Sequence, residues 1–297
     1  MMRFCLQEHL THPDVPFHIQ RGHIDGPFPL HVHDFSELVV VTGGSGVHAI
    51  DGFSYDVQAG DIYMVLGDTA HGFEQASDLT MFNLMLPSDF CEPEPASGFW
   101  PMERSLRAMP GFQALFILEP YYRREHRFMN RLRVTPAQLD EIGGWLEAKA
   151  TEYEAHPDGC RAMLQADLTH LFVRLSRWMS EPEAPPTGNL LPLSRAMAYM
   201  EAHFAEPLTL SLLAGRAFLS ERHFSRIFQD NYHQSPMAYL QALRLSHACG
   251  LLRRNDRTVT EIAQACGYAD SNLFSRLFTR RYRMTPSAYR KHFGQQA

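Results

Sequence analysis

The stretch Phe224-Ser-Arg-Ile-Phe228 recurs fifty residues later as Phe274-Ser-Arg-Leu-Phe278, and this repeat decides the fold of the C-terminal part of the chain. Seven residues after each copy the same landmarks return: Ser235-Pro236 with Tyr239, and Thr285-Pro286 with Tyr289. Upstream, at a spacing of 49, Leu213-Ala214 matches Ile262-Ala263. A repeat of this kind indicates a duplicated supersecondary unit, although two similar helices of an all-α bundle would also produce it.

Each copy has the pattern of a helix-turn-helix unit. In the first copy the residues predict a short helix over 210–217, a turn through Phe218-Leu219, and a second helix over 221–232 capped by Ser220. The second copy predicts a helix over 260–265, a turn at Gly267-Tyr268-Ala269, and a second helix capped by Asp270. Both second helices bury aromatic and aliphatic residues, which leaves the opposite face for a partner.

The exposed faces of these second helices carry side chains that suit the reading of DNA bases. Arginine pairs with guanine, asparagine with adenine, and serine with several bases or with phosphate. We expect the DNA-binding residues to be Arg222, Ser225, Arg226, Ser271, Asn272, Ser275 and Arg276. Further arginines at helix ends and connections are expected on phosphates: Arg253, Arg254, Arg257, Arg280, Arg281, Arg283 and Arg290. A single exposed arginine is usually only solvated, but this set on matched faces predicts binding to double-stranded promoter or operator DNA.

The charge of the chain is divided unevenly between its two parts. Residues 190–297 hold 14 Arg and Lys against 7 Asp and Glu, a net +7, whereas residues 1–189 hold 13 against 26, a net −13. This asymmetry favours a basic module that meets a polyanion, joined to an acidic module with another partner. Two parts whose surface charges differ for unrelated reasons would give the same charge counts.

Composition narrows the class of protein. With 45% hydrophobic and 20% charged residues, the chain is typical of globular proteins. It has no apolar run long enough for a membrane span and no signal-peptide pattern at its start, so we expect a cytoplasmic protein without membrane contact. The five cysteines have no metal-ligand or redox spacing, which indicates reduced structural thiols.

The pattern predicts an α+β chain of two domains. Over 17–90, short apolar runs alternate with turn signals such as Gly43-Gly44-Ser45-Gly46 and Asp51-Gly52, as in a small antiparallel barrel or sandwich. Two amphipathic helices follow, the first capped by Thr135 and the second beginning near Cys160. The Pro-rich stretch 181–189 is the predicted linker between domains 1–180 and 190–297, and we expect it to keep them thermodynamically distinct.

Residues 193–291 resemble the AraC/XylS family of bacterial regulators. The resemblance includes the linking segment 239–252 and the landmarks Gly267-Tyr268, Thr285-Pro286 and Tyr289-Arg290. It implies two helix-turn-helix units, joined by a long helix, that read successive major-groove turns on one face of DNA. Two positions depart from the family, which usually has glycine where His233 and Arg283 stand, so a small strain is expected at these helix ends.

The N-terminal stretch His31-Val-His33-Asp-Phe-Ser-Glu37, with Gly60-Asp61 and His71, resembles the cupin pattern. His31 and His33 lie two residues apart on a strand and therefore on one face. The resemblance implies a cupin-like β-barrel with flanking helices, in which His31, His33, Glu37 and His71 point into one cavity. We expect these four residues to bind the effector. The part of the cupin pattern around Gly60-Asp61 and His71 departs from the pattern of cupin enzymes at Leu66, Asp68 and Gln75.

Three hypotheses remain for this cluster: a metal-dependent cupin enzyme fused to a DNA-binding module, a metal-free sugar pocket, and structural polar residues at a barrel mouth. Similarity to the sugar-sensing, rhamnose-responsive members of the family, through His33-Asp34-Phe35 and 130–135, favours the second. We therefore expect a regulator that is not an enzyme, and more specifically an activator that contacts RNA polymerase. We expect this regulator to form a homodimer, to bind a small-molecule effector, and to use no metal and no cofactor. Tyr63, Phe73, Phe82 and Trp100 could stack on a sugar or belong to the core.

Overall fold

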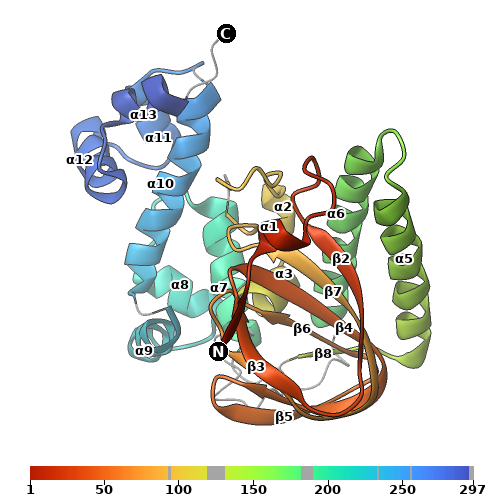
Figure 1. Cartoon of the computed structure of the whole chain (residues 1–297). Helices are drawn as coiled ribbons and strands as arrows, with labels where there is room; N and C mark the ends of the chain where they lie inside the picture. Colours follow the sequence, from red (N-terminus) through yellow and green to blue (C-terminus); the bar gives the residue numbers. More distant parts are fainter. Residues whose placement is uncertain (93–94, 119–130, 182–189, 233, 255, 294–297) are drawn as a thin grey trace.

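The computed structural model describes the chain except residues 93–94, 119–130, 182–189, 233, 255 and 294–297, and omits the side chains of 190–192 and 230–232. A β-barrel lies at the centre with the paired helices α5 and α6 on one flank, and the C-terminal helices extend from the other side (Figure 1). The expected α+β, two-part architecture is confirmed. The predicted linker 182–189 and the cap position His233 lie outside the described residues.

The barrel strands form one sheet in the order β1-β3-β7-β4-β6-β8, with β2 added to β7 and β5 added to β4. Their bounds are β1 Met2–Phe4, β2 His18–Ile24, β3 Phe28–His33, β4 Phe35–Ile50, β5 Phe53–Gln58, β6 Asp61–Val65, β7 His71–Pro87 and β8 Leu132–Arg133, with the short helix α1 Leu6–His9 after β1. The strand β1, which pairs with β3 in parallel, was not predicted.

The glycine cluster at 43–46 does not form the expected turn. Strand β4 runs through it as far as Ile50 and pairs with β7 along most of its length, with register shifts on both sides of Gly43. Gly44 has φ +68°, and a Cβ there would lie 2.1 Å from the carbonyl oxygen of Asp78. The glycines therefore allow a bulge that bends a long strand around the barrel, because only glycine tolerates this close backbone approach.

Strand β4 is buried on both faces, which explains its continuous apolar run. Val39 and Val41 pack inside the barrel, whereas Leu38 and Val40 pack under the helical layer. That layer consists of α2 Arg104–Arg107, α3 Pro110–Phe112, the π-helix η1 Gln113–Leu118, α5 Pro136–Ala155 and α6 Cys160–Met179. Thr135 caps α5 in a capping box with Gln138, as predicted.

The C-terminal part is all-helical, as predicted. It comprises α7 Leu190–His203, α8 Leu210–Arg216, α9 Glu221–Tyr232, α10 Pro236–Arg254, α11 Val259–Ala265, α12 Ser271–Tyr282 and α13 Pro286–Phe293. The pairs α8–α9 and α11–α12 are the two helix-turn-helix units, and α10 is the long helix between them (Figure 1). Ser220 and Asp270 accept hydrogen bonds from the first turns of α9 and α12, which confirms both predicted caps.

The two parts of the chain share buried contacts. Helix α7 packs against α3 and η1 of the N-terminal part, and Leu118 of η1 belongs to the apolar cluster under α8 and α9. The expectation of two thermodynamically distinct modules therefore does not describe this conformation, because side chains outside the linker join them. Within the described residues, no helix combines the length and apolar character needed to cross a membrane.

Candidate effector pocket and DNA-reading faces

A cavity of about 340 Å³ opens inside the barrel, and all four predicted effector residues line it. His31 and His33 come from β3, Glu37 from β4, and His71 from β7. Pairing of β3 with β7 sets His31 directly opposite His71, so residues forty apart in sequence meet at the same level of the barrel. The structure thus brings together every side chain that the motif predicted, and their function as effector ligands remains a prediction.

Three imidazoles in this cavity form one hydrogen-bonded series. His33 Nδ1 lies 2.6 Å from the carbonyl oxygen of Phe35, His33 Nε2 lies 3.0 Å from His71 Nε2, and His48 Nε2 lies 3.2 Å from His71 Nδ1. Since a carbonyl only accepts, His33 Nδ1 donates, and in a neutral ring its Nε2 must accept. His71 then donates through Nε2 and accepts from His48 through Nδ1. With three neutral rings, this assignment gives each of the three contacts one donor and one acceptor, and it orients each ring.

Burial controls the charge of the cavity. The pKa of His33 is lowered to about 4 because the protein removes its ring from water, and the pKa of His31 is lowered for the same reason. Burial raises the pKa of the Glu37 carboxyl to about 7. Among the described residues the nearest ionisable partner of Glu37 is His71 Nε2, at 3.9 Å, which is beyond hydrogen-bond distance. The carboxyl is therefore available to a ligand hydroxyl.

Several polar residues of the cavity were not predicted, among them His48 and Asn83. His48 belongs to the imidazole series, and Asn83 has a buried Oδ1 without a hydrogen-bond partner in the described part of the chain. Asn83 lies on β7 an even number of residues after the predicted pocket residue His71, so strand alternation could have found it. Of the four aromatic candidates, Tyr63 and Phe73 line the cavity, whereas Phe82 and Trp100 belong to the apolar core outside it.

The donor set also fits a metal ion. One ligand atom each of His33, Glu37 and His71 lie within 4.8 Å of one another, and all three residues are buried. Two imidazoles and a carboxylate are ligands that divalent transition metals accept.

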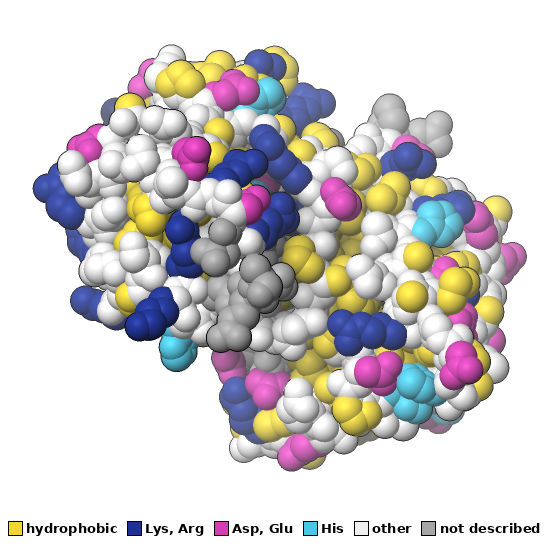
Figure 2. All heavy atoms as spheres, turned by 90° about the horizontal axis from the view of Figure 1, so that it is seen from above, with side chains coloured by type: hydrophobic (Ala, Val, Ile, Leu, Met, Phe, Trp, Pro, Cys, Tyr) yellow, Lys and Arg dark blue, Asp and Glu magenta, His cyan; other side chains and the backbone are white. Residues whose placement is uncertain are grey.

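The predicted DNA-reading residues lie on the accessible faces of α9 and α12. Arg222, Arg226, Asn272 and Arg276 are exposed, and Ser225, Ser271 and Ser275 are half-buried. The opposite faces bury Phe224 and Phe228 in the first unit, and Phe274 and Phe278 in the second. Figure 2 shows Lys and Arg side chains gathered over the half of the molecule formed by the C-terminal helices, at left. The contact of these residues with DNA remains a prediction.

Two of the arginines assigned to phosphates have structural roles. The guanidinium of Arg290 donates to the carbonyl oxygen of Arg257 across 2.7 Å, which ties α13 to the segment before α11. Arg283 ends α12 with φ +59°, the left-handed conformation that its position was expected to require. A non-glycine residue pays a small strain there.

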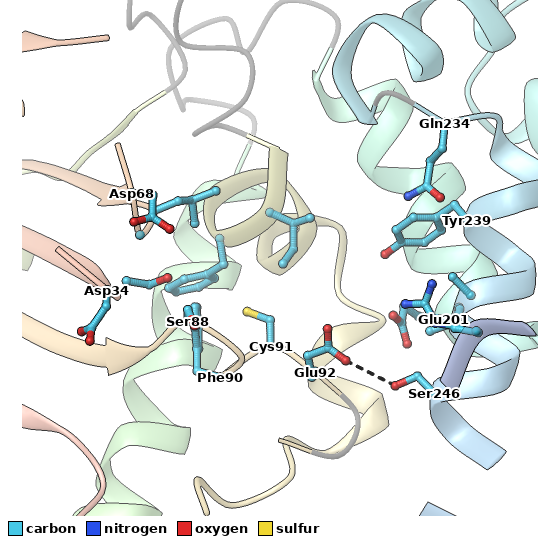
Figure 3. Close-up of a pocket in the computed structure, with 18 residues that line it drawn as sticks. Asp34, Asp68, Ser88, Phe90, Cys91, Glu92, Glu201, Gln234, Tyr239 and Ser246 are labelled. Atoms are coloured by element: carbon cyan, nitrogen blue, oxygen red, sulfur yellow. Dashed lines mark hydrogen bonds between the residues drawn. The ribbon is translucent and has the colours of Figure 1, made fainter. Parts of the chain in front are cut away.

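A second cavity, of about 470 Å³, lies between the barrel and the C-terminal helices (Figure 3). Asp34 and Asp68 line it on the barrel side, and Tyr239 and Ser246 of α10 line it on the other. Ser246 Oγ donates to Glu92 across the gap, at 3.4 Å.

A buried ion pair also connects the N-terminal part of the chain to the C-terminal helices. Arg107 of α2 donates to Glu201 of α7 at 2.8 Å, and both side chains are at most 5% exposed. Arg104 donates to the carbonyl oxygen of Glu201 at 2.9 Å and stacks over the Phe204 ring. His247 of α10 also lies 3.1 Å from Arg107. The arginines of α2 therefore join the N-terminal part to two helices of the C-terminal part.

Comparison with known proteins assigns both parts of the chain. Residues 15–118 match the family described as the AraC-like ligand binding domain, and residues 213–292 match a family described as a helix-turn-helix domain. The chain is 30% identical over 267 residues to the HTH-type transcriptional activator RhaS of Salmonella arizonae, covering 89% of this chain and 88% of that relative. RhaS of Salmonella schwarzengrund gives the same identity and coverage.

Among solved structures, an AraC-type transcriptional regulator from Chromobacterium violaceum is 29% identical. The alignment covers 36% of this chain and 95% of that chain, with a TM-score of 0.34.

Proposed function

Because this chain belongs to the AraC family of DNA-binding transcription regulators, we propose that it activates target promoters when an uncharged sugar binds in its barrel. The observation that carries this proposal is a polar cavity in the ligand-binding domain, lined by His31, His33, Glu37 and His71. It is combined with two exposed, basic helix faces in the same chain.

We assign DNA reading to the seven exposed and half-buried residues on α9 and α12. Arg226 and Arg276 occupy matched positions in the repeat, both exposed, and are proposed to contact guanine. Asn272 is proposed to contact adenine near the start of α12. The serines Ser225, Ser271 and Ser275 are proposed on bases or phosphates, with Arg222 one helical turn before Arg226.

The cavity supports an uncharged ligand over a sugar acid or sugar phosphate. Burial lowers the pKa of His31 and His33, which disfavours a positive charge on these two rings. The arginine on its rim, Arg21, is already paired with Glu147 and Glu154 of α5. An anion would therefore meet no available cation in the described lining. Hydroxyl groups could bond to Glu37 and Asn83, while Tyr63 and Phe73 offer apolar faces for sugar C–H groups.

We propose that ligand binding reaches DNA through the α2 contact. The Arg107–Glu201 pair and the Arg104 contacts attach α7 directly to the ligand-binding domain. Helix α7 packs on α8, which supports the recognition helix α9. A shift of the helical layer would therefore move the first reading face and, through α10, the second. Coupling of this kind needs two arrangements with different effector affinity.

The proposed assembly is a homodimer that acts with RNA polymerase in the cytoplasm. Half-buried Trp145 of α5 and Trp178 of α6 line a small pocket formed by these two helices, together with Ile142 and Leu171. Aromatic anchors of this type are common in protein interfaces, so we propose α5 and α6 as the dimer surface.

A second candidate function follows from the metal-compatible cluster: a cupin enzyme fused to a DNA-binding module. His33, Glu37 and His71 would hold the ion, which would supply a Lewis-acidic centre with open positions. We propose instead that the chain is not an enzyme, which agrees with its similarity to a transcriptional activator. Metal analysis of purified protein separates the two. The enzyme requires about one equivalent of metal and turnover of a sugar, whereas we expect an effector response that survives chelation.

Mapping of the protein across its own genome, with and without candidate sugars, tests the proposal as a whole. We expect discrete promoter sites whose occupancy or transcription changes with one sugar. Uniform coverage that no sugar changes would contradict it.

A further inference from the structure

A groove of about 820 Å³ lies on the first helix-turn-helix unit, away from the barrel cavity. Its floor consists of small residues, Ala198 and Ala202 of α7 and Gly215 of α8. Its walls carry side chains that are unusual on a surface: Leu212, Phe218, Tyr199, Arg195 and Arg216. The segment between α2 and α3 closes one end through Ala108 and Pro110. We refer to these ten residues as the α7–α8 groove.

The repeat supplies an internal comparison for this groove. Helices α8 and α11 have the same length, and the side chains of Thr209 and Thr258 each accept a hydrogen bond from the backbone N–H three residues later. At the spacing of 49, Leu212 corresponds to Glu261, Arg216 to Ala265, and Phe218 to Gly267. The buried positions of the two helices are conserved in type, Leu213-Ala214 against Ile262-Ala263. The fold therefore does not require the apolar and cationic residues of the first copy.

Phe218 is unfavourable in two respects. It is 77% exposed, and its φ of +54° lies in the left-handed region, where the matching Gly267 has +79°. A bulky residue in this conformation is strained, and exposing its ring to water forfeits burial of the apolar surface. A glycine would remove both costs. Strain held at an exposed aromatic residue points to a role outside the folding of the chain.

Within the described part of the chain, the two arginines of the groove have aromatic partners and no acidic one. Arg195 lies over the ring of Phe218, with Cζ 5.6 Å from the centroid, and Arg216 lies over Tyr199 at 4.1 Å. Among the described residues neither forms an ion pair, whereas Arg107, Arg133 and Arg174 do. The groove thus presents two cations stacked on aromatic rings beside apolar side chains. Its charge complements an acidic partner.

We propose that the α7–α8 groove docks an acidic protein segment with an apolar anchor, which the transcription machinery supplies at the promoter. This inference rests on the proposed function as a transcription activator. The apolar anchor would cover Leu212 and Phe218, and carboxylates would pair with Arg195 and Arg216. Arginine and aromatic residues in a concave patch are typical of the few side chains that dominate an interface.

The test replaces groove residues with their counterparts from the second copy. The double variant Arg216→Ala/Phe218→Gly keeps residues that the same turn already accepts in α11, and it removes the strain at 218. Full-length protein is bound to promoter fragments that it selects from genomic DNA, and recruitment of RNA polymerase holoenzyme is then titrated. We expect the variant to recruit polymerase roughly tenfold more weakly, with a melting temperature at least as high as the wild type and unchanged affinity for the fragment. Arg3→Ala, an exposed arginine of the barrel, is the matched control.

Two results would overturn the inference. Recruitment equal to the wild type would show that the groove docks no part of the polymerase. Promoter affinity falling as much as recruitment would show that the arginines contact DNA phosphates instead. Failure of the proposed function looks different, because the wild-type chain itself would then select no promoter fragment, and the inference would fall with it.

Discussion

The guanidinium of Arg107 donates to the carboxylate of Glu201 across 2.8 Å, and this buried pair joins the ligand-binding domain to the first helix of the DNA-binding part. Removing one partner leaves the other charge buried and without its ion pair. We expect Arg107→Ala to lower the free energy of unfolding by about 3 kcal/mol and to abolish the effect of the sugar on DNA binding.

The double variant Arg107→Met/Glu201→Met serves as the control for this pair. Because it removes both charges, it should recover most of the stability in urea denaturation while DNA binding stays insensitive to the sugar. A double variant that responds to sugar like the wild type would exclude the pair as the connection between the domains.

The pocket residues should affect the response to the effector and leave the affinity for DNA intact. Glu37→Gln keeps the shape of the side chain but changes its hydrogen bonding, so we expect sugar binding to weaken by roughly tenfold or more, the cost of a lost charged hydrogen bond. The measurement is calorimetric titration with the effector. Glu74→Gln is the matched control, because Glu74 is exposed on the same strand β7 as His71 and bonds only to Ser54 within the described chain. Equal sugar affinity for Glu37→Gln and Glu74→Gln would remove Glu37 from the site.

The pKa of Glu37 predicts a pH dependence of stability. Burial raises this pKa from 4.5 to about 7, so between these values the unfolded chain has lost a proton that the folded chain keeps. Stability must therefore fall as pH rises through this window, by up to about 1.4 kcal/mol per pH unit. His33, with its pKa lowered to about 4, has the opposite effect between pH 6.5 and 4.

Comparison with Glu37→Gln isolates the carboxyl, since His33 is present in both proteins. The unfolding free energy of Glu37→Gln minus that of the wild type should increase from pH 4.5 to 7 and be constant above pH 7. A difference that is constant over the whole range would mean that Glu37 has an ordinary pKa in the folded protein.

In the DNA-binding part, substitution of a base-reading arginine and substitution of a structural arginine should have different effects. We expect Arg226→Ala and Arg276→Ala each to cost about 1–3 kcal/mol at the cognate operator and to relax preference at one base position. Arg290→Ala should lower the melting temperature instead, because its guanidinium bonds to the carbonyl oxygen of Arg257. Fluorescence anisotropy on cognate and random DNA measures the first effect. Equal losses on both DNAs for Arg226 and Arg276 would place them on the backbone.

The sequence predicted those features that local chemistry determines. The repeat located both helix-turn-helix units and their caps at Ser220 and Asp270, because capping and helical spacing are local properties. The resemblance to the cupin pattern located the pocket, and strand alternation placed His31 and His33 on one face. Arg283 was recognised as a left-handed helix end from the resemblance, because the family usually has glycine at this position.

Features that depend on distant partners could not be read from the sequence. The glycines at 43–46 looked like a turn, since nothing local shows that Asp78 approaches Gly44 and requires a bulge. His48 enters the imidazole series only through the pairing of β4 with β7. The Arg107–Glu201 pair joins residues 94 apart, and the Pro-rich composition of the linker indicated separation instead.

Titration of the full-length protein with its operator and with unrelated DNA, at salt concentrations from about 50 to 200 mM, measures the DNA binding on which the proposed function depends. Binding of two basic helix faces to phosphates predicts that affinity falls steeply with salt, that the operator is preferred throughout, and that the effector sugar changes operator affinity. No retardation of any DNA at any salt concentration, or an affinity that does not depend on salt, would contradict the account.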